Sequence, residues 1–198
     1  MSGSPSDPDQ PTAACRDRLT GVPGGARSAD AWLFARLVAA REVRGERALL
    51  GLSASEMAGL AARHFAAGAL AAPSHESVAV LNEKHAAFAA AMRDFLIGLA
   101  APETDADDAR CLATILAHAC LRPDHLWRDL GLSGRDDVTQ MLTRFFPEVV
   151  ARNTGNLRWK KLLARELALS RGEASGPAPG CPGCEDFGFC FPDGKRAH

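Results

Sequence analysis

Hydrophobic residues in the middle of the chain recur at spacings of three and four, which is the period of an amphipathic α-helix. The most regular run predicts one helix of about 22 residues, with apolar positions at Val78, Leu81, His85, Phe88, Met92, Phe95 and Leu99. Two earlier helices carry start signals. Ser28 precedes a run that reaches Glu42, and Ser53 with Glu56 has the spacing of a capping box. Gly68 can end the second of these helices.

Further apolar runs follow, and the residues expected to open them are Thr104, His125, Ser133 and Asn156. Pro147 marks a kink or a new helix start between the last two runs. Alanine and leucine dominate these segments and β-branched runs are few, so helix is favoured over strand. The pattern predicts an all-α fold, in which residues 28–171 form a single bundle of about six or seven helices.

Glycine and proline concentrate at the two ends of the chain. Residues 1–27 hold four of each, and residues 172–198 hold six glycines and four prolines. We therefore expect residues 1–27 to be a disordered N-terminal tail. Residues 172–198 are expected to be a flexible linker followed by a cysteine cluster.

The net charge of −1 gives the chain no basic field for binding nucleic acid through its phosphates. No apolar run approaches the roughly 20 residues of a membrane span. The first residues lack the charged-then-apolar pattern of a secretory signal, so we expect the cytoplasm. In that reducing compartment six cysteines are expected as thiols or metal ligands instead of disulfides.

Three of these cysteines, Cys181, Cys184 and Cys190, have the spacing C-x2-C-x5-C. A C-x-x-C turn can direct two sulfurs to one centre, and thiolates suit zinc, Cu(I) and iron–sulfur clusters. The interleaved Phe187, Phe189 and Phe191 could shield such a centre from water. Structural zinc needs four ligands, and the candidates for a fourth are Cys120, His125 and His198. A redox dithiol at Cys181 and Cys184, or three free thiols, are the other interpretations.

Two blocks and the cysteine cluster resemble the NifQ family of nitrogen-fixation proteins. The blocks are CLRPDHLWRDLGL at 120–132 and FFPEVVARNTGNLRWKK at 145–161, and the resemblance covers about residues 110–191. It implies a carrier with an iron–sulfur cluster that holds molybdenum and donates it to assembly of the nitrogenase iron–molybdenum cofactor. The partners it implies are the assembly scaffold and the nitrogenase iron protein.

The family motif is C-x4-C-x2-C-x5-C, and its first cysteine position falls on Gly176 in this chain. Three interpretations stay open. Three thiolates can hold a three-iron face of a cuboidal cluster and leave one corner open for molybdenum. Cys120 can replace the missing thiolate, or the site is a degenerate copy that binds its cluster weakly.

Other residues with ligand chemistry have ordinary structural interpretations. His64 and His85 lie on apolar helix faces, which is typical of core histidines, and Cys111 and His118 share an interior face. His125 fits a structural hydrogen bond better than a metal. The basic run Arg152, Arg158, Lys160, Lys161 and Arg165 is typical of a solvated helix face. Arg158 and Lys160 could also bind an anion such as molybdate.

The chain carries no nucleophile elbow, phosphate-binding loop, dinucleotide fingerprint or zinc-protease motif. We therefore expect a carrier and not an enzyme. The alternative is a helical interaction protein that uses zinc only as a structural staple and transfers no metal. A third interpretation is an interaction bundle with a vestigial cysteine tail.

Overall fold

The computed structural model describes residues 9–70, 81–192 and 194. These residues form ten α-helices and two short 3₁₀ helices, with no strand among them. The predicted all-α class is confirmed, but the described residues contain more helices than expected. Residues 10–20 and 187–190 are helical, and Pro147, predicted as a kink or a new start, begins a separate helix over 147–151. The chain divides into two compact units, residues 1–78 and 79–198, instead of one domain over 28–171.

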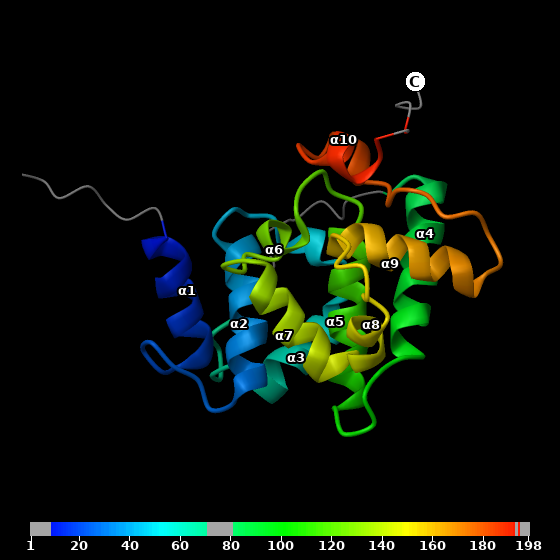
Figure 1. Ribbon diagram of the computed structural model, residues 1–198. Coiled ribbons are helices and arrows are strands. Elements are labelled where there is room, and N and C mark those ends of the chain that lie inside the picture. Colours follow the sequence, from blue (N-terminus) through cyan, green and yellow to red (C-terminus); the bar gives the residue numbers. More distant parts are fainter. Residues whose placement is uncertain (1–8, 71–80, 193, 195–198) are drawn as a thin grey trace, which may run out of the picture. The chain divides into compact units, whose positions relative to one another are not determined.

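The first unit contains three α-helices and a 3₁₀ helix (Figure 1), and their bounds are α1 Gln10–Thr20, α2 Ala29–Glu42, η1 Arg47–Leu50 and α3 Ala54–His64. Helix α1 lies where a disordered tail was predicted. Cys15 and Leu19 are buried on the face that packs on α2, and Gly21, with a φ of 68°, ends the helix. The tail prediction is therefore wrong for the part of 1–27 that is described, while residues 1–8 lie outside the described residues.

The predicted helix starts of this unit are confirmed. The Ser28 hydroxyl accepts a hydrogen bond from the Ala31 amide, and Ser53 forms a reciprocal capping box with Glu56. Helix α3 ends at His64 and not at Gly68, because Phe65 already has an extended backbone. His64 is buried and its ring stacks on Phe34 with centroids 5.0 Å apart, as expected for a core histidine.

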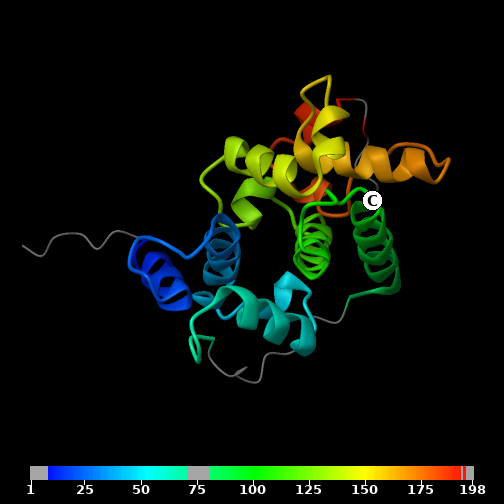
Figure 2. The ribbon, with the colours of Figure 1, turned by 90° about the horizontal axis from the view of Figure 1, so that it is seen from below.

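The second unit begins with six helices (Figure 2), and their bounds are α4 Glu83–Ile97, α5 Ala106–Ala119, α6 Leu126–Asp129, α7 Arg135–Phe145, α8 Pro147–Ala151 and α9 Trp159–Ser170. Helix α5 buries residues around most of its circumference, including Cys111, which identifies it as the core helix. Helix α4 packs along α5 and also contacts α9. Within the described part of the chain, no helix combines the length and apolar character needed to cross a bilayer.

Helix α4 is shorter than the predicted 22-residue run. It begins at Glu83 because the Asn82 side chain caps the His85 amide, and Val78 lies outside the described residues. The buried face consists of Ala89, Met92 and Leu96. His85 is only half-buried, so its assignment to the core is wrong.

Three other helices begin slightly later than predicted. The Asp105 carboxylate, and not Thr104, accepts hydrogen bonds from the first amides of α5. Gly134 takes the place expected for Ser133 before α7. Asn156 has a left-handed φ of 49°, so Arg158 is the residue that precedes α9.

Candidate metal centre

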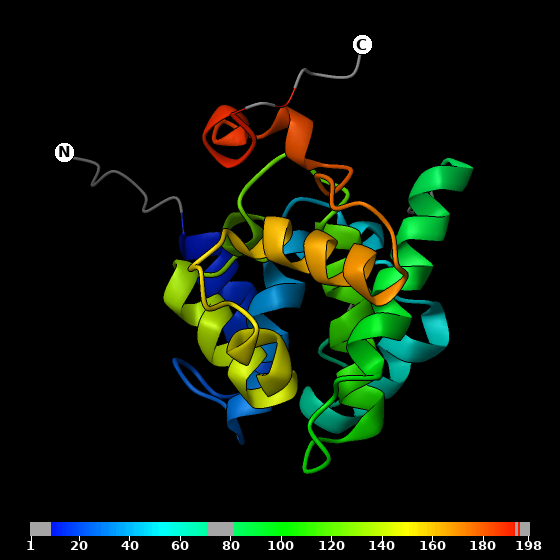
Figure 3. The ribbon, with the colours of Figure 1, turned by 45° about the vertical axis from the view of Figure 1, so that its right-hand side comes forward.

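The segment after α9 returns to the end of α5 (Figures 1 and 3). Ala178 is completely buried, and the Gly180 amide donates a hydrogen bond of 3.0 Å to the Cys120 carbonyl. The short helix η2 Cys181–Gly183 follows at once, and α10 Phe187–Cys190 follows it. The segment was expected to be a flexible linker. Its last residues before Cys181 are instead packed against the end of α5.

Two glycines let the cysteine turn approach the backbone closely. A Cβ atom on Gly180 would lie 2.0 Å from the Arg122 carbonyl oxygen, and one on Gly183 would lie 2.4 Å from Pro123 Cβ. Neither position can accept a larger residue without movement of the backbone. The loop from Cys120 to Pro123 is therefore a platform that sets the position of Cys181 and Cys184.

All three clustered cysteines line one cavity of about 570 Å³, a volume that includes the solvent at its mouth. The sequence-predicted residues His125, Arg158 and Lys160 also line it, together with Lys161. The structure therefore brings together residues from the start of α6, the start of α9 and the C-terminal segment. His198, the remaining candidate for a fourth ligand, lies outside the described residues.

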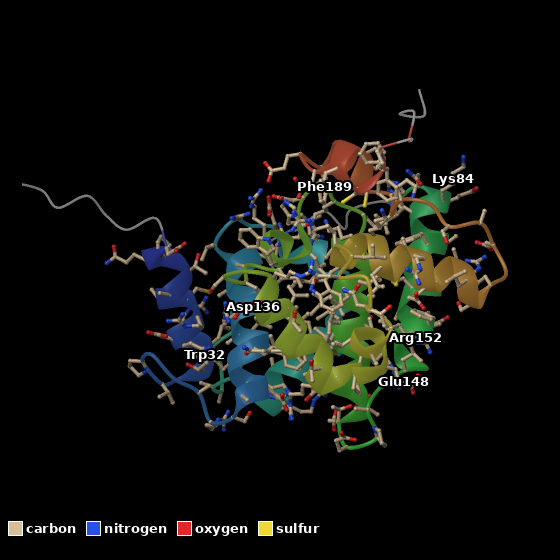
Figure 4. All side chains as sticks on the ribbon, in the orientation of Figure 1. Trp32, Lys84, Asp136, Glu148, Arg152 and Phe189 are labelled. Atoms are coloured by element: carbon tan, nitrogen blue, oxygen red, sulfur yellow. The ribbon has the colours of Figure 1, made fainter. Side chains whose placement is uncertain are left out.

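The aromatic residues of the cluster divide into two groups. Phe187 and Phe191 line the cavity, and their ring centroids lie 5.3 Å apart. Phe189 is instead 78% exposed and lies on α10 at the surface (Figure 4), so it does not shield the cavity as expected. Two of the three phenylalanines thus limit the access of water to the thiols.

Positive charge from α9 faces the thiols. Burial raises the pKa of the Cys181 thiol and of the Cys190 thiol, which opposes metal binding because a ligand must lose its proton. Lys160 acts against this rise at Cys181, and Lys161 acts against it at Cys190. Lys161 also donates a hydrogen bond to the Cys190 carbonyl. The start of α9 therefore favours the thiolate form that a metal needs.

Among the described residues, no three His, Cys, Asp or Glu side chains are arranged closely enough to hold a single metal ion. The ligands of a multi-iron cluster need not converge on one point, since each binds a different iron atom. Three thiols around one cavity have the donor chemistry of a soft metal centre, and thiolates suit zinc, Cu(I) and iron–sulfur clusters.

The model of the NifQ family matches residues 32–192 of the chain, which is more than half of its length. The chain belongs to the NifQ family. The match includes both sequence blocks and the cysteine cluster, and membership supports a role in nitrogen fixation. No solved structure matches the chain.

Three curated NifQ proteins illustrate the similarity. The NifQ homologue of Sinorhizobium fredii is 43% identical over 83 residues, covering 42% of this chain and 36% of that protein. NifQ of Azotobacter vinelandii is 41% identical over 80 residues, 40% of this chain and 41% of the relative. NifQ of Rhodobacter capsulatus is 37% identical over 94 residues, 48% and 49% of the two chains. The aligned part of the chain thus spans between about a third and a half of the length of these relatives.

The NifQ motif lacks one ligand in this chain, and Cys120 and His125 are the two described candidates for it. The structure distinguishes between them. Gly176, at the position of the missing cysteine, does not line the cavity. Cys120 does not line it either, and burial raises the pKa of its thiol to about 12. His125 does line the cavity, and its side chain is 15% exposed. The geometry therefore favours His125 over Cys120.

Replacement of Cys120 by serine should leave the iron content of the anaerobically reconstituted protein unchanged, because the sulfur lies behind the cavity wall. Iron and acid-labile sulfide per chain are the measurements. Cys111→Ser, in the buried part of α5, which Cys120 directly follows, is the matched control for the cost of burying a hydroxyl. A loss of iron in Cys120→Ser alone would show that Cys120 is a ligand.

Arg158 and Lys160, the two residues of the basic run that could also bind an anion, both pair with carboxylates of the protein. The Lys160 ammonium is buried, forms an ion pair with Asp129 and donates a 2.8 Å hydrogen bond to the Arg122 carbonyl. Lys160 is therefore part of the fold and does not project toward solvent. Arg158 pairs with Asp186 at 2.8 Å and lies over the Phe189 ring.

Sequence reasoning did not single out Lys161, which contacts both the Cys190 carbonyl and the Phe191 ring. Its position three residues after Arg158 was an available signal, since residues at that spacing share a helix face. The partnership of Lys160 with Asp129 had no such signal, because the two residues are 31 positions apart.

Proposed function

We propose that this chain is a metal carrier of nitrogenase cofactor assembly. In this proposal Cys181, Cys184 and Cys190 hold an iron–sulfur cluster, which accepts molybdenum and donates it for synthesis of the iron–molybdenum cofactor. The observation that supports it best is that all three thiols of the NifQ-like motif line one cavity. The chain acts as a carrier and not as an enzyme.

Each part of the cavity has a task in this proposal. The thiolates bind iron, for which soft sulfur donors are suited. The charges of Lys161 and Arg158 offset the negative charge that three thiolates and inorganic sulfide bring together. Phe187 and Phe191 restrict water, which otherwise promotes loss of the cluster.

The proposed partners are the cofactor assembly scaffold and the nitrogenase iron protein, and the proposed source of the cargo is molybdate. We place the chain in the cytoplasm, where reducing conditions keep the thiols available for iron. Cys184 and Cys190 are only partly buried, so the cargo side of the cavity can be reached from solvent.

Metal analysis of the protein purified without oxygen tests the proposal. We expect a brown protein with iron, sulfide and molybdenum, and loss of all three in the triple variant Cys181→Ser, Cys184→Ser and Cys190→Ser. Cys15→Ser is the control, since Cys15 lies on α1 in the other unit. Absence of iron after reconstitution of the unaltered chain would refute the carrier function.

A structural zinc staple is the second candidate function. It is favoured by the close packing of the η2 turn against the Arg122–Pro123 backbone, which a staple would reinforce. The same experiment separates the two, because a staple gives a colourless protein with zinc and without sulfide.

A further inference from the structure

The cysteine segment has a base that is fixed to the fold and an outer part that is not fixed in the same way. At the base, the Gly180 amide is hydrogen-bonded to the Cys120 carbonyl, and Cys181 is only 7% exposed. The outer part, residues 185–191, includes α10 and lies at the edge of the second unit, outside its longer helices (Figures 1 and 3). Among the described residues, its backbone–backbone hydrogen bonds all have their partners within 184–194.

Ion pairs between side chains connect this outer part to two helices. Arg158, directly before α9, places Nη2 2.8 Å from Asp186 Oδ2. Arg128, in α6, places Nη1 3.2 Å from Glu185 Oε1. His125 Nε2, directly before α6, lies 3.4 Å from both carboxylates. The two adjacent acidic residues are therefore contacted from two elements at once.

The remaining contacts of the outer part also come from side chains. Arg158 lies over the Phe189 ring at 5.7 Å, and Lys161 lies over the Phe191 ring at 4.9 Å. The Arg158 and Arg128 side chains are each 45% exposed. Exposed ion pairs contribute little stability and are weakened by salt. The outer part is thus attached more weakly than the base, which is the usual property of a segment that opens locally.

The point at which such an opening would bend is defined by the close packing of the base. Gly183 is the last residue of η2, and a Cβ there would lie 2.4 Å from Pro123 Cβ. Helix α10 begins at Phe187. The connection over residues 184–186 is therefore where a change in backbone direction leaves both the platform and α10 intact.

We propose that residues 185–191 form a flap, which is held closed over the cavity by the Arg158–Asp186 and Arg128–Glu185 ion pairs. In the closed form Phe187 and Phe191 line the cavity together with Cys181. Opening moves the two rings away and gives the buried Cys181 thiol access to solvent. The role of the flap in loading and release rests on the carrier function proposed above, whereas its motion can be measured without any metal.

Thiol labelling of the metal-free, reduced protein tests the motion. The protein is exposed briefly to N-ethylmaleimide, and the labelling of each cysteine is measured by mass spectrometry. Cys181 is the readout, because it is buried and lines the cavity. Cys190 is unsuitable, since burial and, to a smaller extent, Asp186 raise the pKa of its thiol, and loss of Asp186 would change its reactivity without motion.

The test variant combines Glu185→Gln with Asp186→Asn, which removes both ion pairs and keeps the side chains almost the same size. We expect Cys181 to be labelled about fivefold faster or more, the scale of two exposed ion pairs lost together. Glu173→Gln is the matched control. It removes an exposed pair of the same kind, Arg171 Nε–Glu173 Oε1 at 2.9 Å, outside the flap, and should leave the labelling of Cys181 unchanged.

Salt supplies a second measurement on the same proteins. Raising the salt concentration from about 0.01 M to about 1 M shortens the screening length from about 30 Å to about 3 Å. Labelling of Cys181 should become about twofold faster or more in the unaltered chain and in Glu173→Gln. It should hardly change in the double variant, because that protein has no latch carboxylates left to screen.

The buried thiols of Cys111 and Cys120 report on unfolding of the whole unit in every sample. Equal labelling of Cys181 in the double variant and the unaltered chain would overturn the flap, and so would a parallel rise at Cys111 and Cys120. After reconstitution with iron and sulfide, the double variant should lose iron to a chelator faster than the unaltered chain. An equal rate would overturn the role of the flap in release. Failure of the unaltered chain to bind iron would instead refute the carrier function, and the labelling would still decide on the flap.

Discussion

Gly180→Ala should strongly reduce metal loading of the cysteine cluster while leaving the three cysteines in place. The added Cβ would lie 2.0 Å from the Arg122 carbonyl oxygen and 2.4 Å from the carbonyl carbon, so the backbone itself would have to move. The φ of −80° at Gly180 is one that alanine adopts freely, so the clash alone is the cause. Overpacking of this kind costs about 1–3 kcal/mol or more, and about 1.4 kcal/mol corresponds to a tenfold change in binding. We expect retention of iron against a chelator to fall about tenfold or more.

Gly176→Ala is the matched control, because a Cβ at that position meets nothing within 4 Å. It changes the same residue type in the same segment, four positions earlier, and should bind iron like the unaltered chain. Gly183→Ala, whose Cβ would lie 2.4 Å from Pro123 Cβ, should resemble Gly180→Ala. Normal iron retention in both Gly180→Ala and Gly183→Ala would mean that the Cys120–Pro123 platform does not position the cysteines.

The parts of the fold that could be predicted from sequence are those determined by neighbours along the chain. Ser28 and the Ser53–Glu56 capping box mark their helices correctly because a cap needs only the next three residues. The apolar run of α5 is likewise visible without knowledge of its partners. The cysteine spacing also indicated that the thiols lie near one another, since the C-x-x-C turn is local, and all three line one cavity. That they bind one metal centre stays a prediction.

The parts that could not be predicted depend on contacts between distant segments. Helix α1 has little apolar character of its own, and only its packing on α2 explains why it is ordered. Lys160 resembles a solvated residue in sequence, and its burial depends on Asp129. Gly180 is one glycine among several in a loop-like segment, and its necessity is evident only from the approach of Arg122.

Lys160→Met should destabilise the second unit by about 3 kcal/mol, the low end of the cost of breaking a buried ion pair. Methionine keeps most of the aliphatic volume but removes the positive charge. The buried Asp129 carboxylate then loses one of the cations that neutralise it. Arg122 Nε still donates to Asp129 at 3.2 Å, which limits the loss. The Arg122 carbonyl also loses the 2.8 Å hydrogen bond from Lys160. The measurement is urea unfolding followed by tryptophan fluorescence in a Trp32→Phe background, so that Trp127 and Trp159 alone report on this unit.

Two comparisons decide whether the charge pair causes the loss. Lys84→Met removes an exposed lysine from α4, labelled in Figure 4, and should change the free energy of unfolding by less than about 0.5 kcal/mol.

Asp129→Asn combined with Lys160→Met removes the uncompensated charge and should recover part of the stability, giving a coupling of about 0.5–3 kcal/mol between the two positions. If the effects of the two substitutions simply add, the ion pair does not hold the platform. The position of the cysteine turn would then depend on the glycine contacts alone, and the chelator assay on Lys160→Met should show normal iron retention.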